Sequence, residues 1–321
     1  MTPSLAPPHF GPAEAAAAAR LIELALAEDL GDRGDITSQA LLPPELTGKV
    51  NIVARAEGVI SGVPVGELVL RQVDAVCQWE SHRSEGTMVE TGAIIATVTG
   101  PVRSLLTAER TILNFLTHLS GVATLTRRYV DAVAGTTAAI LDTRKTLPGW
   151  RMLEKYAVRC GGGTNHRIGL WDAVLIKDNH LAAVAEQDGR SLADIVKLAR
   201  DRAPGGVTVE IEVDSLEQLA DVFNGAPDIV LLDNMTLTLL REAAALRNRA
   251  APDVLLEASG GVDLTSVGAI ARCGVDRISV GRLTHSAPAL DLSFDWQDLL
   301  ATAGARCAGS PPTHHSRSNG R

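Results

Sequence analysis

Short apolar runs alternate with helical patterns through residues 138–284, and this repeat constrains the fold more than any other feature of the sequence. Strands that alternate with helices form parallel sheets with right-handed crossovers. The repeat is shorter than the ~250 residues that a closed eight-unit barrel usually needs, so we predict an open, incomplete α/β barrel. The six runs are AAILDTRK, DAVLIKDNH, VTVEIEV, DIVLLDN, DVLLEASGG and DRISVGR.

The chain of 321 residues has room for a second domain before this repeat. Residues 14–30 have a helical pattern, residues 48–100 contain short strand-like runs with glycine turns, and a long helix that begins after Pro101 is expected to join the domains. The predicted division is a disordered N-terminus (1–12), an α/β sandwich-like domain (13–120), the open barrel (121–286), a C-terminal segment that could pack on the N-terminal domain (287–304) and a disordered tail (305–321).

The composition excludes several classes of protein. The net charge is −8, whereas binding to nucleic acid or to an anionic membrane needs wide clusters of Lys and Arg. No uncharged apolar stretch is long enough for a membrane span. The four cysteines, Cys77, Cys160, Cys273 and Cys307, form no C-x-x-C pair, which argues against a zinc knuckle or a disulfide framework. We therefore expect a cytoplasmic protein with no nucleic-acid or membrane partner.

Basic residues gather between positions 142 and 177 of this acidic chain. Arg144, Lys145 and Lys177 follow strand-like runs, and His166 and Arg167 follow the glycine-rich stretch CGGGT. Ligands bind at the carboxyl ends of the strands in such folds, so we expect these side chains to meet a ligand with more than one acidic group. A set of structural salt bridges is the alternative, although few acidic residues lie nearby in the sequence.

Three more basic residues in this region have a plainer interpretation. Arg151, Lys155 and Arg159 recur at i, i+4 spacing on a predicted helix, which indicates a solvent-exposed face. The glycine-rich stretch itself raises the question of a metal site at His166. No second group of metal ligands accompanies that histidine in the sequence, so we do not expect one.

Carboxylates mark two neighbouring runs. Glu210 and Glu212 share one face of the run VTVEIEV and are expected to point into the barrel, and Asp233 ends the next run. Buried carboxylates without partners are costly. We therefore expect the three to contact cations, sugar hydroxyls or a metal ion.

Two loops suit a phosphate group. Ser259–Gly261 and Val280–Arg282 each follow a strand-like run and contain small residues, which leave backbone N–H groups accessible. No nucleophile elbow and no H-E-x-x-H motif is present. The inventory predicts a site that joins an acidic molecule to a sugar phosphate, while a Schiff-base aldolase using Lys177 stays open.

Several long motifs in the chain resemble one enzyme family. The stretch DTRKTLPGWRMLEKYAVRCGGGTNHRIGLWDAVLIKDNH, followed by EIEVDSLEQ, LLDNM, EASGG and ISVGR, is similar to quinolinate phosphoribosyltransferase, as are EDLGDRGDITS and LLTAERTILNFLTHLSGVAT. The resemblance covers roughly residues 20–295. It implies that quinolinate and 5-phosphoribosyl 1-diphosphate react, with Mg²⁺, to give nicotinate mononucleotide, diphosphate and CO₂ in NAD biosynthesis, on an open α/β barrel in a homodimer.

The resemblance also assigns roles to the matching positions. Arg110, which from the sequence alone would be a surface residue of the long helix, would reach the site of the neighbouring subunit. The residues that would line the quinolinate pocket are Thr143, Arg144, His166, Arg167 and Lys177. Those that would bind the 5′-phosphate are Ser259, Gly260, Gly261, Val280, Gly281 and Arg282.

Four residues would serve the chemistry. They are Lys145, Lys177, Glu212 and Asp233. Lys145 would face the phosphoribosyl donor, and Glu212 and Asp233 would contact its ribose hydroxyls and, indirectly or through the substrate, Mg²⁺. A related phosphoribosyltransferase with a different acceptor, the Lys177 aldolase and a non-catalytic binding protein remain as alternatives.

Overall fold

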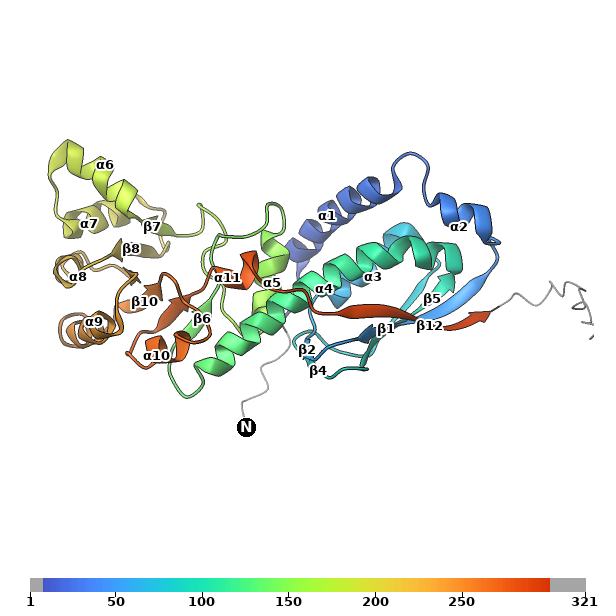
Figure 1. Cartoon of the computed structure of the whole chain (residues 1–321). Coiled ribbons are helices and arrows are strands. Elements are labelled where there is room, and N and C mark those ends of the chain that lie inside the picture. The colour runs from blue at the N-terminus through green and yellow to red at the C-terminus, as the bar shows by residue number, and fades with distance from the viewer. Residues whose placement is uncertain (1–7, 301–321) are drawn as a thin grey trace, which may run out of the picture.

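A computed structural model describes residues 8–300, with the side chains of 185–188 and 298–300 not placed. The molecule is elongated, with an antiparallel sheet at one end, a parallel sheet at the other and the long helix α4 (Val102–Ala132) between them (Figure 1). Residues 1–7 and 305–321, where we predicted disorder, lie outside the described residues, and helix α1 begins at Pro12.

The N-terminal part is built on a four-stranded antiparallel sheet in the order β12-β1-β5-β3. Its C-terminal strand β12 pairs with β1 along its whole length, so the segment after the barrel returns to the N-terminal part. A small ladder of β2 and β4 lies beside the sheet. The strands are β1 (Thr47–Ala54), β2 (Gly58–Val59), β3 (Gln78–Ser81), β4 (Met88–Val89), β5 (Ile94–Pro101) and β12 (Leu292–Leu300), and the helices are α1 (Pro12–Leu30), α2 (Ile36–Leu41) and α3 (Val63–Val73).

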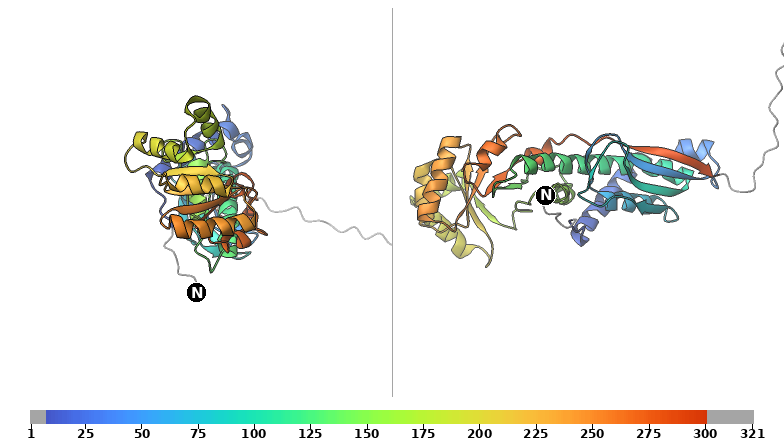
Figure 2. Two further views of the ribbon diagram at one scale, coloured as in Figure 1. Left: turned by 90° about the vertical axis from the view of Figure 1, so that its left-hand side faces the viewer. Right: turned by 90° about the horizontal axis from the view of Figure 1, so that it is seen from below.

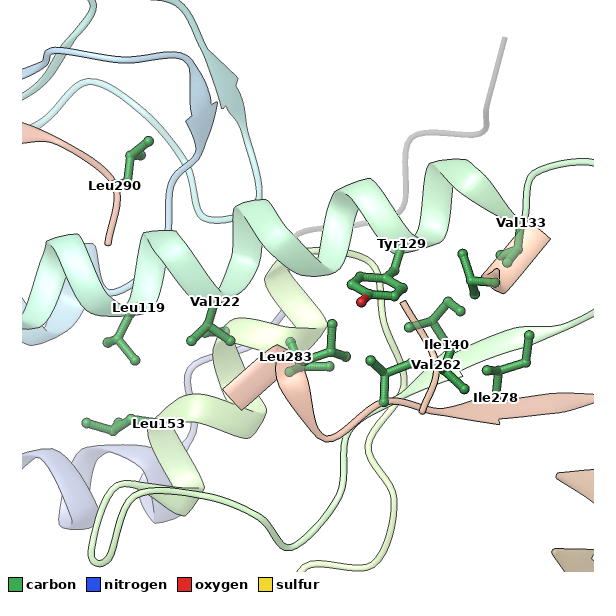
Figure 3. Close-up of a cluster of buried hydrophobic side chains, with 14 of the residues drawn as sticks. Leu119, Val122, Tyr129, Val133, Ile140, Leu153, Val262, Ile278, Leu283 and Leu290 are labelled. Carbon is green, nitrogen blue, oxygen red and sulfur yellow. The ribbon is translucent and has the colours of Figure 1, made fainter. Parts of the chain in front are cut away.

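Helix α4 joins the two parts of the molecule because apolar residues recur along its inner faces. Its first half packs on α3 and β5, and its second half contacts β6, α5, α10 and α11. The right-hand view of Figure 2 shows the helix extending from the N-terminal part to the barrel. Figure 3 shows the second contact, where Leu119, Val122 and Tyr129 of α4 lie among buried apolar side chains from several barrel elements.

The C-terminal part contains a six-stranded parallel sheet in the order β6-β11-β10-β9-β8-β7. Each of the six apolar runs forms one of its strands, and β6 and β7 do not pair with each other, which confirms the open α/β barrel. The strands are β6 (Ala139–Leu141), β7 (Val174–Ile176), β8 (Val209–Val213), β9 (Ile229–Asp233), β10 (Leu255–Ser259) and β11 (Arg277–Ser279). The helices are α5 (Arg151–Cys160), α6 (Asp178–Asp188), α7 (Leu192–Arg202), α8 (Leu216–Phe223), α9 (Leu237–Ala250), α10 (Val267–Ala271) and α11 (Arg282–His285).

The register of the sheet brings the polar strand ends to one edge. Asp233 at the end of β9 is paired with Ser259 at the end of β10. On β8, Val209, Ile211 and Val213 are buried, as the alternation of the run VTVEIEV predicts. Among residues 8–300, no helix is both long and apolar enough to cross a membrane.

Candidate active site

A cavity of 710 Å³ opens at the carboxyl ends of the parallel strands. Every residue that the sequence or its family resemblance placed in the site lines it, apart from Arg110 and Glu210. The additional lining residues, which sequence reasoning missed, are Leu175, Leu231, Asn234, Glu257, Val262, Ser279 and His285. The structure thus gathers residues from all six strand ends and their loops around one space.

Two exposed cations in this cavity have no protein partner. The side chains of Arg144 and Lys145 are exposed, and neither pairs with a carboxylate within the described residues. Arg167 is half-buried, and its Nη1 donates to the carbonyl oxygen of Ala173 at 3.1 Å. Burial, followed by the charge of nearby Arg144, lowers the pKa of Arg167. A guanidinium remains charged even so, and two such groups near each other favour an anionic ligand between them.

Lys177 differs from these cations because it already has a partner. Its Nζ lies 2.6 Å from Oε2 of Glu212, and its side chain is 44% exposed. An amine nucleophile for a Schiff base needs a desolvated or otherwise deprotonated lysine. The paired, solvent-accessible Lys177 therefore gives no support to the aldolase alternative.

His166 is held inside the barrel by two carboxylates. Its Nε2 lies 3.2 Å from Oε2 of Glu210 and 3.2 Å from Oε1 of Glu257, and Arg277 Nε donates to the other oxygen of Glu257 at 2.7 Å. Burial opposes a charge on the imidazole, but the hydrogen bonds to Glu210 and Glu257 outweigh it and raise the pKa of His166 to about 9. The backbone N–H of Arg167 donates to Nδ1 at 2.8 Å and opposes a second ring proton. We predict from the raised pKa that His166 carries a positive charge at neutral pH, and the charged ring must give up the bond from Arg167 because a protonated Nδ1 cannot accept it.

The two glutamates respond differently to the same surroundings. Burial raises the pKa of Glu210, whereas the hydrogen bond from His166 and the charge of Arg277 overcome burial and lower the pKa of Glu257. Glu210 was predicted to contact a cation, a sugar hydroxyl or a metal ion, and in the structure it contacts the imidazole of His166. Glu257 was missed, although it lies two residues before Ser259 on β10 and so shares a strand face with it.

His166, Glu210 and Glu257 together correct our expectation that no potential metal ligands accompany His166. One ligand atom from each of His166, Glu210 and Glu257 lies within 4.8 Å of the others, a spacing that a metal ion could use. Arg277 already supplies a cation to Glu257. We therefore interpret His166, Glu210, Glu257 and Arg277 as an ionic network.

The prediction of a solvent-exposed basic face on α5 is wrong. Lys155 is 1% exposed and forms an ion pair with buried Asp142. Arg151 donates to the carbonyl oxygen of Ile168 at 3.2 Å, and Arg159 pairs with Glu14 at 2.7 Å. The i, i+4 spacing suggested solvent because the partners lie on elements distant in the sequence.

The glycines before His166 shape the loop instead of holding a phosphate. Gly162 has φ of 88°, a left-handed conformation that favours glycine. A Cβ atom on Gly161 would lie 2.5 Å from the carbonyl oxygen of Ala123, so this glycine lets the loop pack against α4.

A second constrained glycine lies in the predicted phosphate loop. Gly260 has φ of 99°, and a Cβ atom there would lie 2.2 Å from Oδ1 of Asn234. Asn234 itself has φ of 53°, and its side-chain amide donates to Asp233 Oδ2 at 2.7 Å. This contact orients one of the predicted ribose-binding carboxylates.

Arg110 lies apart from the cavity of its own chain. It is exposed on the first half of α4, where it lines a separate depression of 360 Å³ together with residues of α1. Its contribution to the site of a second subunit stays a prediction.

Comparisons with known proteins agree with these features. Residues 35–120 match the family model of the quinolinate phosphoribosyl transferase N-terminal domain, and residues 122–295 match that of its C-terminal domain. The nicotinate-nucleotide pyrophosphorylase [carboxylating] of Mycobacterium leprae is 48% identical over 87% of this chain and 97% of its own length. A probable enzyme of the same name from Bacillus subtilis is 41% identical over 84% of this chain and 89% of its own.

Solved structures extend this likeness to the fold. NadC from Streptococcus pyogenes superposes with a TM-score of 0.83 at 37% identity, covering 90% of this chain and 99% of the other. The nicotinate-nucleotide pyrophosphorylase from Francisella tularensis superposes with a TM-score of 0.80 at 40% identity, covering 88% and 96%. One relationship accounts for both domains, their order and the cavity at the strand ends. The chain belongs to the quinolinate phosphoribosyltransferase family.

Proposed function

We propose that the protein transfers the phosphoribosyl group of 5-phosphoribosyl 1-diphosphate to quinolinate and releases diphosphate and CO₂, forming nicotinate mononucleotide. The observation that carries the proposal is that unpaired Arg144 and Lys145 share one cavity with half-buried Arg167 and the glycine loops. The pyrophosphorylase name of the relatives describes this reaction in the reverse direction.

The acceptor would bind to the cationic wall of the cavity. Quinolinate carries two adjacent carboxylates, and Arg144 and Arg167 can each form charge-assisted bonds with one of them. Positively charged His166 and Lys177 complete this wall. The ring nitrogen of quinolinate supplies the nucleophile, so no activated Ser or Cys is required.

The donor would occupy the part of the cavity formed by the glycine loops after β10 and β11. Ser259–Gly261 and Val280–Arg282 suit its 5′-phosphate, and Lys145 suits its diphosphate. As diphosphate leaves, C1 of the ribose gains oxocarbenium character, as in glycoside hydrolysis. The carboxylates of Glu212 and Asp233 can stabilise that positive charge and accept the ribose hydroxyls.

Decarboxylation follows from the product of the first step. The quaternised ring nitrogen stabilises the electron pair that remains on the adjacent carbon when the C–CO₂ bond breaks. A proton then adds to that carbon. The cationic wall, having bound the dicarboxylate, faces a product with one negative charge fewer, which favours release.

Mg²⁺ belongs to the same proposal. Glu212 and Asp233 offer the carboxylate oxygens that Mg²⁺ prefers, but Glu212 is paired with Lys177, and within the described residues neither belongs to a group of three close ligand atoms. We therefore propose that the diphosphate of the donor would supply most of the ligands of Mg²⁺, with Glu212 and Asp233 as indirect partners. Bound there, Mg²⁺ neutralises charge on the leaving group.

A homodimer completes the proposed site. Arg110 is exposed and lies outside its own cavity, as expected for a residue supplied to a neighbouring subunit. The cytoplasmic location stays a prediction from the sequence.

The reaction is tested by incubating the purified protein with 5-phosphoribosyl 1-diphosphate, Mg²⁺ and quinolinate labelled in its 2-carboxylate. We expect labelled CO₂, diphosphate and nicotinate mononucleotide in equal amounts, and no product with nicotinate as acceptor. Product from nicotinate would favour the related enzyme with a different acceptor. The absence of quinolinate-dependent CO₂ would refute the proposal.

A further inference from the structure

A buried ion pair lies directly behind the cationic wall of the cavity. Asp142 follows the last residue of β6, Lys155 lies on α5, and their side chains are 0% and 1% exposed. Neither residue lines the cavity. From the sequence we predicted an exposed position for Lys155, and neither residue has a role in the function proposed above.

The pair is bonded to the backbone of the loop that carries His166 and Arg167. Oδ1 of Asp142 accepts the backbone N–H of His166 at 2.9 Å, and Nζ of Lys155 donates to the carbonyl oxygen of the same residue at 3.0 Å. The side-chain amide of Asn165 donates to Oδ2 of Asp142 at 2.6 Å and to the carbonyl oxygen of Lys155 at 2.8 Å. Both backbone groups of His166 are therefore fixed by the two members of one ion pair.

These bonds connect the two chain segments that carry Arg144 and Arg167 to each other and to α5. Asp142 lies two residues before Arg144, and Lys155 holds the pair to α5, which packs on α4. The loop is further attached to β6 by an isolated bridge between Leu141 and Thr164. The distance between Arg144 on one segment and Arg167 on another thus depends on the Asp142–Lys155 contact.

We propose that Asp142 and Lys155 are positioning residues that set the spacing of the cations for a dicarboxylate acceptor. The inference rests on the proposed function. It goes beyond that function because it assigns the match between cavity and acceptor to two residues that do not touch the acceptor.

Stability alone does not account for this arrangement. Removing two charges from water is costly, and well-packed apolar residues often replace a buried ion pair without loss of stability. Burial raises the pKa of Asp142 and lowers that of Lys155, so their charged forms depend on their mutual contact. Apolar side chains could fill the same space, but they could not bond to the N–H and carbonyl groups of His166.

The test uses a neutral double variant, Asp142→Leu/Lys155→Met, which leaves no unpaired buried charge and no side-chain partner for the backbone groups of His166. We expect the KM for quinolinate to rise by about 10- to 100-fold, the order of effect that a misplacement of about 1 Å produces. The KM for 5-phosphoribosyl 1-diphosphate should change less than that for quinolinate, because its phosphate loops follow β10 and β11 and, among its proposed contacts, Lys145 lies on the segment that carries Arg144.

A matched control comes from the far end of the same sheet. Arg247 and Asp276 also form a partly buried ion pair, at 2.7 Å, and also bond to backbone groups, but Asp276 precedes β11 while the cavity lies beyond its end. Arg247→Met/Asp276→Asn should affect the melting temperature without changing the KM for quinolinate. An equal rise of that KM in both double variants, or no rise in either, would overturn the proposal.

A crystal structure of the Asp142→Leu/Lys155→Met variant tests the same inference without activity. We expect the loop of residues 165–167 to be displaced relative to Arg144, and an unmoved loop would overturn the positioning role. Failure of the proposed function has a different signature, because the unaltered protein would then release no CO₂ from quinolinate.

Discussion

The free energy of unfolding should decrease as the pH becomes alkaline, because His166 then loses its charge. The pKa of His166 is raised from 6.5 to about 9 in the folded protein by Glu210 and Glu257. A raised pKa means that the folded state binds the proton more tightly than the unfolded chain does, so the stabilisation is complete below pH 6.5 and is lost as the pH rises through 9. The proton on His166 therefore adds about 3 kcal/mol to the free energy of unfolding at pH 6, about 2 kcal/mol at pH 7.5 and almost nothing at pH 10. The imidazole is 8% exposed, so solvent screening reduces these values little.

The assay is urea unfolding of the wild-type protein and His166→Gln at several pH values from 6 to 10. The difference between their free energies of unfolding should shrink by about 3 kcal/mol over this range, because titrating groups that do not contact His166 are common to both proteins and cancel. His9→Gln, at an exposed position away from the cavity, serves as the control and should show no such trend. A difference for His166→Gln that is constant across the range would refute the assignment of a charged His166.

Three further predictions concern the site. Arg144→Ala should lower kcat/KM for quinolinate by about 10- to 100-fold, the loss of one charge-assisted contact of about 1.5 to 3 kcal/mol, without changing the melting temperature; unaltered kinetics would contradict its role. Inactive Arg110→Ala and Lys145→Ala variants should regain part of the activity when mixed, and no recovery despite demonstrated subunit exchange would argue against a shared site. Gly260→Ala should raise the KM for 5-phosphoribosyl 1-diphosphate, because the added Cβ would collide with Asn234. An unchanged KM in steady-state kinetics would contradict this prediction.

The barrel could be predicted because its information is local. Each of the six strands is an apolar run bounded by polar residues, and the alternation with helices determines a parallel sheet. Strand ends of a parallel sheet meet at one edge, so the residues of the cavity followed from the same pattern. The order of the strands in the sheet carries no comparable local signal.

The contacts that position the site residues could not be predicted because they join different elements of the fold. Lys155 has the spacing of a surface residue, and its partner Asp142 lies on a different element. Glu257 is surrounded by apolar neighbours in its run, and His166, which it contacts, lies in a loop across the barrel. In each case a charge that looked solvated or incidental is explained by a second charge brought to it by the fold.

Depth in the barrel explains why similar side chains have different roles. Glu210 and Glu257 are 2% and 0% exposed, and the protein itself supplies their cations, because a buried charge without a partner would be too costly. Arg144 and Lys145 lie at the mouth, where water can solvate them until a ligand arrives. Since the acids near the mouth are fewer than the cations, an anionic substrate completes the balance of charge there. Positive charge in a chain of net charge −8 is thus concentrated where two phosphate-bearing or carboxylate-bearing molecules must be held together.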